Sequence, residues 1–230
     1  MQSIANRIFW FIFLEASLML SPLQVWATVP PLPKDSAPWV GNTLSGAPCQ
    51  GKGQGYGPYD YTNPNHRGNI LKIVEQHHFT PKVEYLESGE TTGKNPIGDI
   101  DYTLRAFPNH HRALYSLINY YFKQTNLYKK SDIYPECYLQ RALNFKLNDG
   151  NVWLLFGLYL HKSGALVPAQ QKYKEAEKIM PNSAELHYNM GLLYFELKDF
   201  ASSKKYAIRA YELGYPLPGL RKKLKQAGHW

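Results

Sequence analysis

The stretch GNVWLLFGLYLHKSGALVPAQQKYKEAEKIMP, residues 150–181, decides the fold of this chain. Residues 184–216, AELHYNMGLLYFELKDFASSKKYAIRAYELGYP, follow the same pattern 34 residues later. Residues of similar kind keep this register: Gly157 with Gly191, Ala176 with Ala210, Phe156 with Met190, and Trp153 with His187. In each copy, two segments with helical periodicity flank a short turn, KSGAL or LKDF. The sequence therefore predicts helical hairpins that recur at a constant interval.

A looser copy of the same unit comes before these two. Its first helix is HRALYSLINYYFKQ, in which Leu114, Leu117 and Tyr121 share one face. Its second helix is PECYLQRALNF, and Ala142 lies 34 residues before the matching Ala176. The connecting segment, TNLYKKSDIY, is longer than the later turns. DIDYTLRAFP, further upstream, predicts a lone second helix that ends at Pro108.

This spacing resembles the tetratricopeptide repeat, which carries a bulky residue, Leu-Gly and Tyr in its first helix and Ala, an aromatic, Ala and Pro in its second. The resemblance implies close packing at the small residues Gly157, Gly191, Ala169 and Ala176, with Tyr173 filling the space and Pro181 ending the unit. The second full copy departs from the family at Ser203, Ala207 and Pro216. Together, GPYDYTN, DYTLRAFPNHHRAL and LGYPLPGLR resemble exported bacterial tetratricopeptide proteins without a settled function.

We therefore expect an all-α fold, namely a short superhelix of tetratricopeptide-type hairpins with about three repeats, a preceding half-repeat and a C-terminal capping helix. The expected boundaries are a signal peptide at 1–27, a Pro- and Gly-rich extension at 28–98 and a repeat domain at 99–230, with units at about 111–149, 150–183 and 184–216 and the capping helix at 217–227. In that last helix, Leu217, Leu220 and Leu224 form the apolar face. A basic helix lying on a membrane surface is the alternative for this segment.

The first residues have the pattern of an export signal. Arg7 precedes the apolar stretch IFWFIFLEASLML, and VWA ends at Ala27 as a small-residue cleavage site. Because Glu15 interrupts a short apolar run, we expect cleavage and a periplasmic or secreted protein without stable membrane insertion. The alternative is an uncleaved N-terminal anchor in the inner membrane. No Cys follows the apolar run directly, so a lipoprotein is not expected.

Residues 28–69 are rich in Pro, Gly and Asn, which predicts irregular structure in which GYGPYDYTNP is ordered by its tyrosines. A short helix should follow, with Thr80 as N-cap, Pro81 in the first turn and Gly89 as its stop. Only two cysteines exist, Cys49 and Cys137. In an oxidising compartment they are expected to form a disulfide, and two unpaired buried thiols are the alternative.

The composition excludes several classes of function. The formal net charge is +8, and Lys and Arg are spread along the chain apart from a cluster in LRKKLKQAGHW, which is too weak a sign to indicate nucleic-acid binding. The sequence has no G-x-S-x-G, phosphate loop, dinucleotide fingerprint, H-E-x-x-H or C-x-x-C motif. We therefore expect no enzyme activity and no cofactor.

Two histidine doublets, His77-His78 and His110-His111, could have a chemical role. FPNHHRALYSL aligns with MPNSAELHYNM, which makes Asn109 the expected N-cap and the second doublet ordinary helix-start residues. Asp99 or Asp101 is expected to cap the helix predicted in DIDYTLRAFP, which precedes the second doublet. The alternative is a metal-binding or catalytic site formed by His77, His78, His110 and His111 with Asp60 or Asp99, which requires the short helix to fold back on the repeats.

The predicted function is a non-enzymatic scaffold that binds a protein or peptide. The resemblance implies that first helices line a concave groove through Tyr115, Asn119, Phe122, Asn151, Leu154, Leu158, His161, Glu185, Tyr188, Leu192 and Phe195. Such an apolar and aromatic groove suits an extended or helical peptide, although the N-terminal extension is an alternative occupant. Leu155 and Glu185 stand where a carboxylate clamp needs polar and basic groups, so that partner class is not expected. The remaining alternative is a structural subunit of an envelope assembly.

Overall fold

The computed structural model describes residues 30–91, 93–123 and 133–230. The helices of these ranges are α1 Asn69–His78, α2 Pro81–Glu84, α3 Ile97–Ala106, α4 His111–Lys123, α5 Pro135–Phe145, α6 Gly150–Lys162, α7 Leu166–Ile179, α8 Ala184–Glu196, α9 Phe200–Glu212 and α10 Gly219–Gln226. A short 3-10 turn spans Lys34–Ser36. No strand occurs among the described residues, apart from an isolated bridge between Asn42 and Pro48. The expected all-α fold is confirmed.

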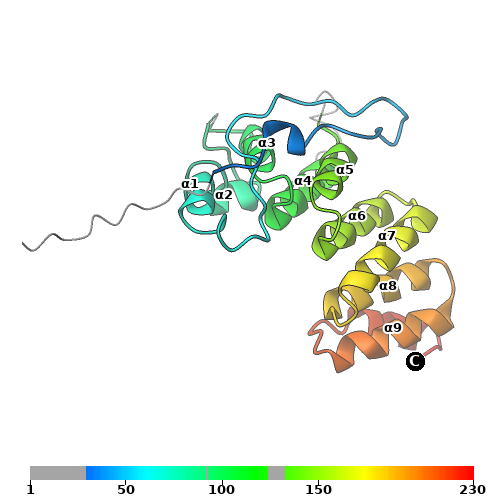
Figure 1. Cartoon of the computed structure of the whole chain (residues 1–230). Coiled ribbons are helices and arrows are strands. Elements are labelled where there is room, and N and C mark those ends of the chain that lie inside the picture. Colours follow the sequence, from blue (N-terminus) through cyan, green and yellow to red (C-terminus); the bar gives the residue numbers. More distant parts are fainter. Residues whose placement is uncertain (1–29, 92, 124–132) are drawn as a thin grey trace, which may run out of the picture.

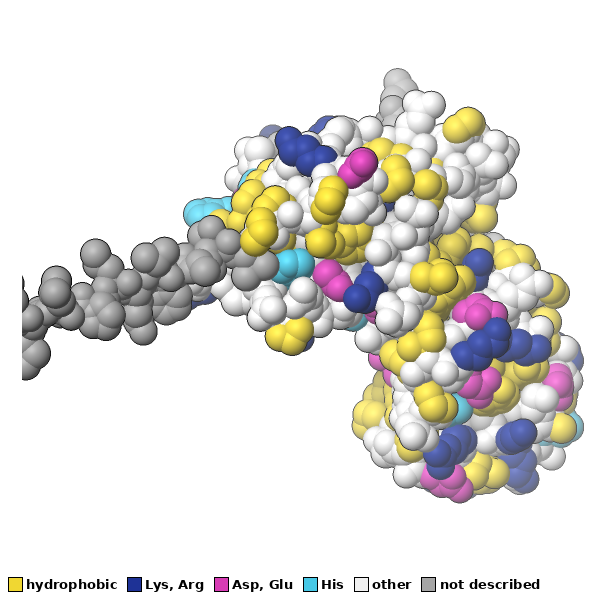
Figure 2. Space-filling view, viewed as in Figure 1, with side chains coloured by type: hydrophobic (Ala, Val, Ile, Leu, Met, Phe, Trp, Pro, Cys, Tyr) yellow, Lys and Arg dark blue, Asp and Glu magenta, His cyan; other side chains and the backbone are white. Residues whose placement is uncertain are grey.

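The helices form a bent stack in which neighbours along the chain pack as antiparallel pairs (Figure 1). The pairs α6–α7 and α8–α9 pack most closely, and α4–α5 is a looser pair of the same kind. The first helices α4, α6 and α8 also contact one another in that order. The space-filling view shows the same bend between the upper part and the lower α8–α9 part (Figure 2). The TNLYKKSDIY connection between α4 and α5 lies mostly outside the described residues.

Small residues allow the paired helices to approach closely, as expected. A Cβ added to Gly157 would lie 2.3 Å from Cδ1 of Tyr173, whose ring is fully buried between α6 and α7. At Gly191 a Cβ would meet Leu220 of α10 at 2.5 Å. Ser203, where the family has Ala, uses its hydroxyl to donate to the Gly191 carbonyl at 2.8 Å. The substitution therefore keeps the close contact and adds a buried hydrogen bond.

The helix starts follow capping chemistry, with one correction to the expected residues. Asp149 and Ser183 accept hydrogen bonds from the first turns of α6 and α8. For α4, the side chain that accepts from the first turn is not Asn109 but His110, whose Nδ1 accepts from the Ala113 N–H at 3.1 Å. Asn109 was expected there from the sequence alignment, but its amide bonds to other segments of the chain. The expected N-cap at Asn109 is therefore wrong.

The N-terminal extension contains more helix than expected. Residues 69–78 form α1, whose Leu71 and Val74 pack with Tyr59, Tyr61 and Phe107 in a small core. This confirms that the tyrosines of GYGPYDYTNP order that segment. α1 was not predicted, because it follows a Gly without a capping side chain and owes its place to these tertiary contacts.

The two helices around residues 80–99 also differ from expectation. α2 ends at Glu84 rather than near Gly89, since Leu86 already has a left-handed backbone with φ of 61°. Thr80 precedes α2 but its side chain makes no capping bond. Asp99 lies inside the first turn of α3, where it accepts from the Glu90 and Thr91 N–H groups and holds the preceding loop. The expected capping role of Asp99 or Asp101 is therefore wrong.

Residues 30–58 lie across α3 and α5 (Figure 1). A disulfide joins Cys49 to Cys137 of α5, as expected. Beside it, the buried Arg141 donates to the Ala37 carbonyl at 2.8 Å and to the Leu104 carbonyl at 2.8 Å. Burial lowers the pKa of Arg141 to about 10. The extension is thus tied to the second helices rather than to the face that α4, α6 and α8 form.

The last helix closes the stack. Leu220 and Leu224 of α10 are fully buried with Tyr188, Ala207 and Ala210. Leu217 was expected on the same face, but the helix begins at Gly219 and Leu217 is 57% exposed. The capping helix is therefore confirmed, with a shorter apolar face. No helix among the described residues is long and apolar enough to cross a membrane.

Candidate functional site

A pocket of about 230 Å³ lies on the face formed by the first helices of the three units. Four of the eleven expected groove residues line it together: Tyr115 of α4, Asn151 and Leu154 of α6, and Glu185 of α8. Leu155, Glu84, His111 and Arg112 complete the lining. This volume is below that of a site for a drug-sized molecule and suits one large side chain. The pocket is therefore the part of the predicted groove where three helices offer side chains to one point.

The pocket combines an apolar floor with two polar side chains that have no hydrogen-bond partner among the described residues. Leu154, which is 4% exposed, and Leu155 give it an apolar floor, while Tyr115 is 48% exposed beside them. The Asn151 side-chain amide makes no hydrogen bond to any described residue, and its backbone N–H donates to the Asp149 carboxylate. The Glu185 carboxylate forms no ion pair or hydrogen bond within the described part of the chain. These two side chains can therefore bond to a guest without breaking an internal contact.

The positive charge at the pocket is already neutralised. Arg112 donates through Nε to Glu84 at 2.7 Å and through Nη1 to Glu75 at 3.1 Å. Hydrogen bonding to Glu84 raises the pKa of Arg112, and its guanidinium also lies 5.4 Å from the centre of the Phe79 ring. His111 uses Nε2 on the Asp149 carboxylate at 2.8 Å. Glu185 is thus the pocket charge left without a partner among the described residues.

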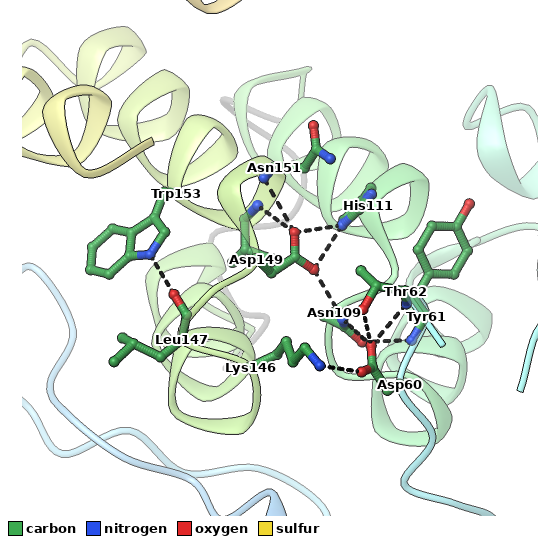
Figure 3. Close-up of polar contacts among 11 residues, drawn as sticks. Asp60, Tyr61, Thr62, Asn109, His111, Lys146, Leu147, Asp149, Asn151 and Trp153 are labelled. Carbon is green, nitrogen blue, oxygen red and sulfur yellow. Dashed lines mark hydrogen bonds and ion pairs between the residues drawn. The ribbon is translucent and has the colours of Figure 1, made fainter. Parts of the chain in front are cut away.

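His111 leads from the pocket into a buried polar network that joins three segments of the chain (Figure 3). Asn109 lies at its centre: its Nδ2 donates to Asp60 at 2.8 Å and to Asp149 at 2.9 Å, and its Oδ1 accepts from the Tyr61 N–H at 2.9 Å. Asp149 also caps α6, so the helix that carries Asn151 and Leu154 starts on this network. The network therefore fixes the extension, the α3–α4 turn and the start of α6 relative to one another.

The network holds Asp60 ionised. Burial alone would raise the pKa of this carboxyl, but Lys146 at 2.9 Å, Thr62 and Asn109 outweigh it and lower the pKa to about 2. Asp60 was singled out in the sequence as a candidate metal or catalytic residue. In the structure its carboxylate accepts hydrogen bonds from Thr62 and Asn109 and forms an ion pair with Lys146. These contacts position the chain.

The other half of the predicted groove continues along α4 and α6. Lys162 donates to the Asn119 side chain at 3.3 Å and lies 5.1 Å from the centre of the Phe122 ring. His161 is largely buried, with Nε2 3.1 Å from the Glu196 carboxylate. Leu158 is half-buried in the main core. None of these residues lines the pocket.

The third unit's expected groove residues pack against the end of the same chain. Tyr188 is 8% exposed, its ring stacks on Tyr215 with centroids 4.0 Å apart, and its hydroxyl accepts from the Leu220 N–H. Leu192 and Phe195 belong to the same cluster with α10. Tyr188, Leu192 and Phe195 thus support the capping helix, which leaves the pocket between α4, α6 and α8 as the open part of the face.

Three histidines of the two doublets, namely His78, His110 and His111, bond to three different carboxylates. His110 is fully buried; because its Nδ1 accepts from Ala113, its proton is on Nε2, which donates to Glu75 at 3.1 Å. Burial lowers the pKa of His110. His78 bonds to Asp99 at 3.0 Å and stacks on Tyr102. No group of three or more His, Cys, Asp or Glu side chains among the described residues is placed to hold a metal ion.

Sequence reasoning missed Glu84, His111, Arg112 and Leu155 as pocket residues. Glu84 comes from α2, outside the repeats, and reaches the site because α2 packs against α4. The repeat pattern carries no signal for such a neighbour. None of residues 30–68 lines the pocket, and their hydrogen bonds to the repeats go to α3, α5 and the α3–α4 turn. The described extension therefore does not fill the pocket.

Comparison with known proteins agrees with the repeat architecture. Residues 157–198 match a family model described as TPR repeat, which spans most of α6 to α8. A segment of 90 residues is 31% identical to human cilia- and flagella-associated protein 70, and the match covers 38% of this chain and 8% of that protein. The chain therefore spans a small fraction of this relative's length, and the likeness concerns that segment alone. Together, the matched repeat model and the stacked helical hairpins show that this chain contains tetratricopeptide repeats.

Proposed function

We propose that this protein is a non-enzymatic scaffold that holds a peptide segment of a partner protein against α4, α6 and α8. Tetratricopeptide repeats are in general protein-interaction modules. The observation that carries the proposal is the pocket at Tyr115, Asn151 and Glu185, where an amide and a carboxylate that have no partner among the described residues flank an apolar floor. An amide that can both donate and accept suits a peptide backbone, and the floor suits an apolar anchor side chain.

The charge of the pocket indicates what the peptide should carry. Glu185 has no partner among the described residues, whereas Arg112 is neutralised by Glu84 and Glu75. A Lys or Arg next to the apolar anchor would form an ion pair with the Glu185 carboxylate, while an acidic residue there would be repelled. The expected ligand is therefore a peptide with a basic residue beside a large apolar one.

Selection from a random displayed peptide library against the full chain tests this proposal. Affinities of the selected peptides are then measured by fluorescence anisotropy for Tyr115→Ala/Asn151→Ala and for a control pair, Val167→Ala/Ile179→Ala, which changes exposed apolar residues of α7. The first pair should weaken binding about tenfold or more, since it removes a contact ring and a hydrogen-bonding group. The control pair should leave the affinity unchanged. Failure to select any peptide whose binding depends on the first pair would overturn the proposal.

We further propose that the protein acts in an oxidising compartment of the bacterial envelope, periplasmic or secreted. The apolar stretch IFWFIFLEASLML, the small-residue cleavage site that ends at Ala27 and the Cys49–Cys137 disulfide support this location. Mass spectrometry of the protein isolated from its native cells gives the N-terminal residue and the thiol state together. A mass that retains residues 1–27 together with two free thiols would contradict export.

A further inference from the structure

The net positive charge of the protein is concentrated at one end of the repeat stack. Residues 197–230 contain eight Lys and Arg residues and two acidic ones, which accounts for six of the eight net charges of the chain. Half of these basic residues belong to one helix, α10, whose sequence is GLRKKLKQ. The rest of the chain is close to neutral overall. The end of the stack is therefore electrostatically distinct from the pocket face.

The basic residues of this end are not neutralised by the chain itself. Arg209 pairs with Glu212 at 3.5 Å, but Lys198, Arg221, Lys222, Lys223 and Lys225 form no ion pair with any described residue. All five are exposed. The face that Figure 2 shows over α7–α9 differs, because basic and acidic side chains are mixed there. We call Lys198, Arg221, Lys222, Lys223 and Lys225 the basic end.

The packing of α10 determines how this charge is presented. Leu220 and Leu224 are fully buried in the stack, so α10 is held rigidly and cannot turn its apolar face to another surface. Its charged face therefore points outward. Lys198 and Lys223 both lie over the Phe195 ring, at 5.9 and 5.6 Å, which brings α10 charges next to the α8–α9 turn. The basic end is consequently one continuous surface built from two segments.

Aromatic side chains lie within the basic end. The Arg221 guanidinium lies 4.4 Å from the centre of the Tyr211 ring and 4.9 Å from that of Trp230. Leu217 is exposed just before α10. Trp and Tyr next to Lys and Arg are typical of surfaces that meet the headgroup region of a membrane.

We propose that the basic end docks the protein peripherally on an anionic phospholipid surface, independently of the peptide pocket. Four of its five charges are lysines, whose flexible ammonium groups match many headgroup positions, whereas a defined site on an acidic protein favours the planar fork of Arg. The single arginine of the basic end is already held against two rings. Five cations also fall within the range in which clusters bind anionic lipid. An acidic protein partner is the competing outcome of the test below.

Vesicle sedimentation with the full chain tests the proposal. The vesicles contain either phosphatidylcholine alone or phosphatidylcholine with roughly one-third phosphatidylglycerol. The variant Lys222→Gln/Lys223→Gln/Lys225→Gln removes three charges of the basic end. The matched control is Lys72→Gln/Lys94→Gln/Lys174→Gln. It removes three exposed lysines that lie outside the basic end and form no ion pair with any described residue. Circular dichroism melting checks that both variants are folded.

The unmodified chain should sediment with the phosphatidylglycerol vesicles, and less so as salt rises from about 0.15 M to about 0.5 M. Since each cation near an anionic surface contributes about fivefold in affinity, the α10 variant should bind about a hundredfold more weakly. The control should bind nearly as the unmodified chain does. Every variant keeps the same N-terminal residues, so any binding by those residues cancels in the comparison.

Three results would overturn the proposal. One is equal weakening in the two triple variants, which would make the effect one of net charge. Another is equal binding to neutral and anionic vesicles. The third is strong, Lys222-dependent binding to immobilised poly-glutamate without binding to vesicles, which would assign the basic end to an acidic protein.

Discussion

Replacing Asn109 by Ala tests whether the buried network, rather than local helix capping, is the role of this residue. The Asn109 amide is fully buried and bonds to Asp60, Asp149 and the Tyr61 N–H. The substitution leaves two carboxylates each without one donor and one buried N–H without an acceptor. Each such loss costs about 1–3 kcal/mol, and water entering the vacated space recovers part of it. The free energy of unfolding should therefore fall by about 3–5 kcal/mol.

The chain provides a matched control for this substitution. Asn182 occupies the same place before α8 that Asn109 occupies before α4, but it is exposed and accepts one hydrogen bond, from Arg209 at 2.8 Å. Asn182→Ala should cost about 0.5 kcal/mol or less. If instead both asparagines only ended a local turn or capped a helix, the two substitutions would each cost about 1 kcal/mol.

Urea unfolding with the disulfide intact, followed by circular dichroism, measures both values. Stacked repeats can unfold in parts, so the slope of the transition is compared between variants before free energies are derived. Protease cleavage within residues 30–68 gives a second readout, because the extension loses the Tyr61 anchor only in Asn109→Ala. A loss below about 1 kcal/mol for Asn109→Ala, or equal losses for the two asparagines, would refute the network argument.

Three further predictions concern stability. Reduction of the disulfide, or Cys49→Ser, should destabilise the protein by up to about 4.5 kcal/mol on the loop model for its separation of 88 residues, measured as a lower melting temperature; an unchanged melting temperature would contradict this. Gly157→Ala should cost about 1–3 kcal/mol because its Cβ would overlap a tyrosine ring, whereas Gly98→Ala, in a helix with open space, should be neutral or stabilising, and urea midpoints in the reverse order would refute the packing argument. As the pH is lowered below about 6.5, stability should fall, because His110 binds a proton more readily in the unfolded chain than it does when buried in the folded one. It should fall again from about pH 4 to pH 2 as Asp60 is protonated; a melting temperature constant from pH 7 to 3 would exclude both effects.

The peptide pocket could be predicted from the sequence in part. Its three repeat helices and four of its residues follow from the 34-residue register, because first helices of successive units must face the same way. Its charge does not, since Arg112 is neutralised by Glu84 and Glu75 from α2 and α1, which stand outside the register. The residues expected from α8 show the same limit, because the fold of the C-terminal segment covers Tyr188.

By itself the sequence determined the hairpins, their interval, the small residues between them and the capping helix, because these features depend on local periodicity. It limited the two cysteines to one possible pair, and the structure decided between that disulfide and two free thiols. The tertiary structure alone decided that Asn109 joins a buried network instead of capping α4, that α1 forms at all, and that the pocket carboxylate of Glu185 has no partner within the described part of the chain. Those outcomes depend on which distant side chains meet in a low-dielectric interior, where each donor and carboxylate needs a partner, and a repeating pattern carries no record of such neighbours.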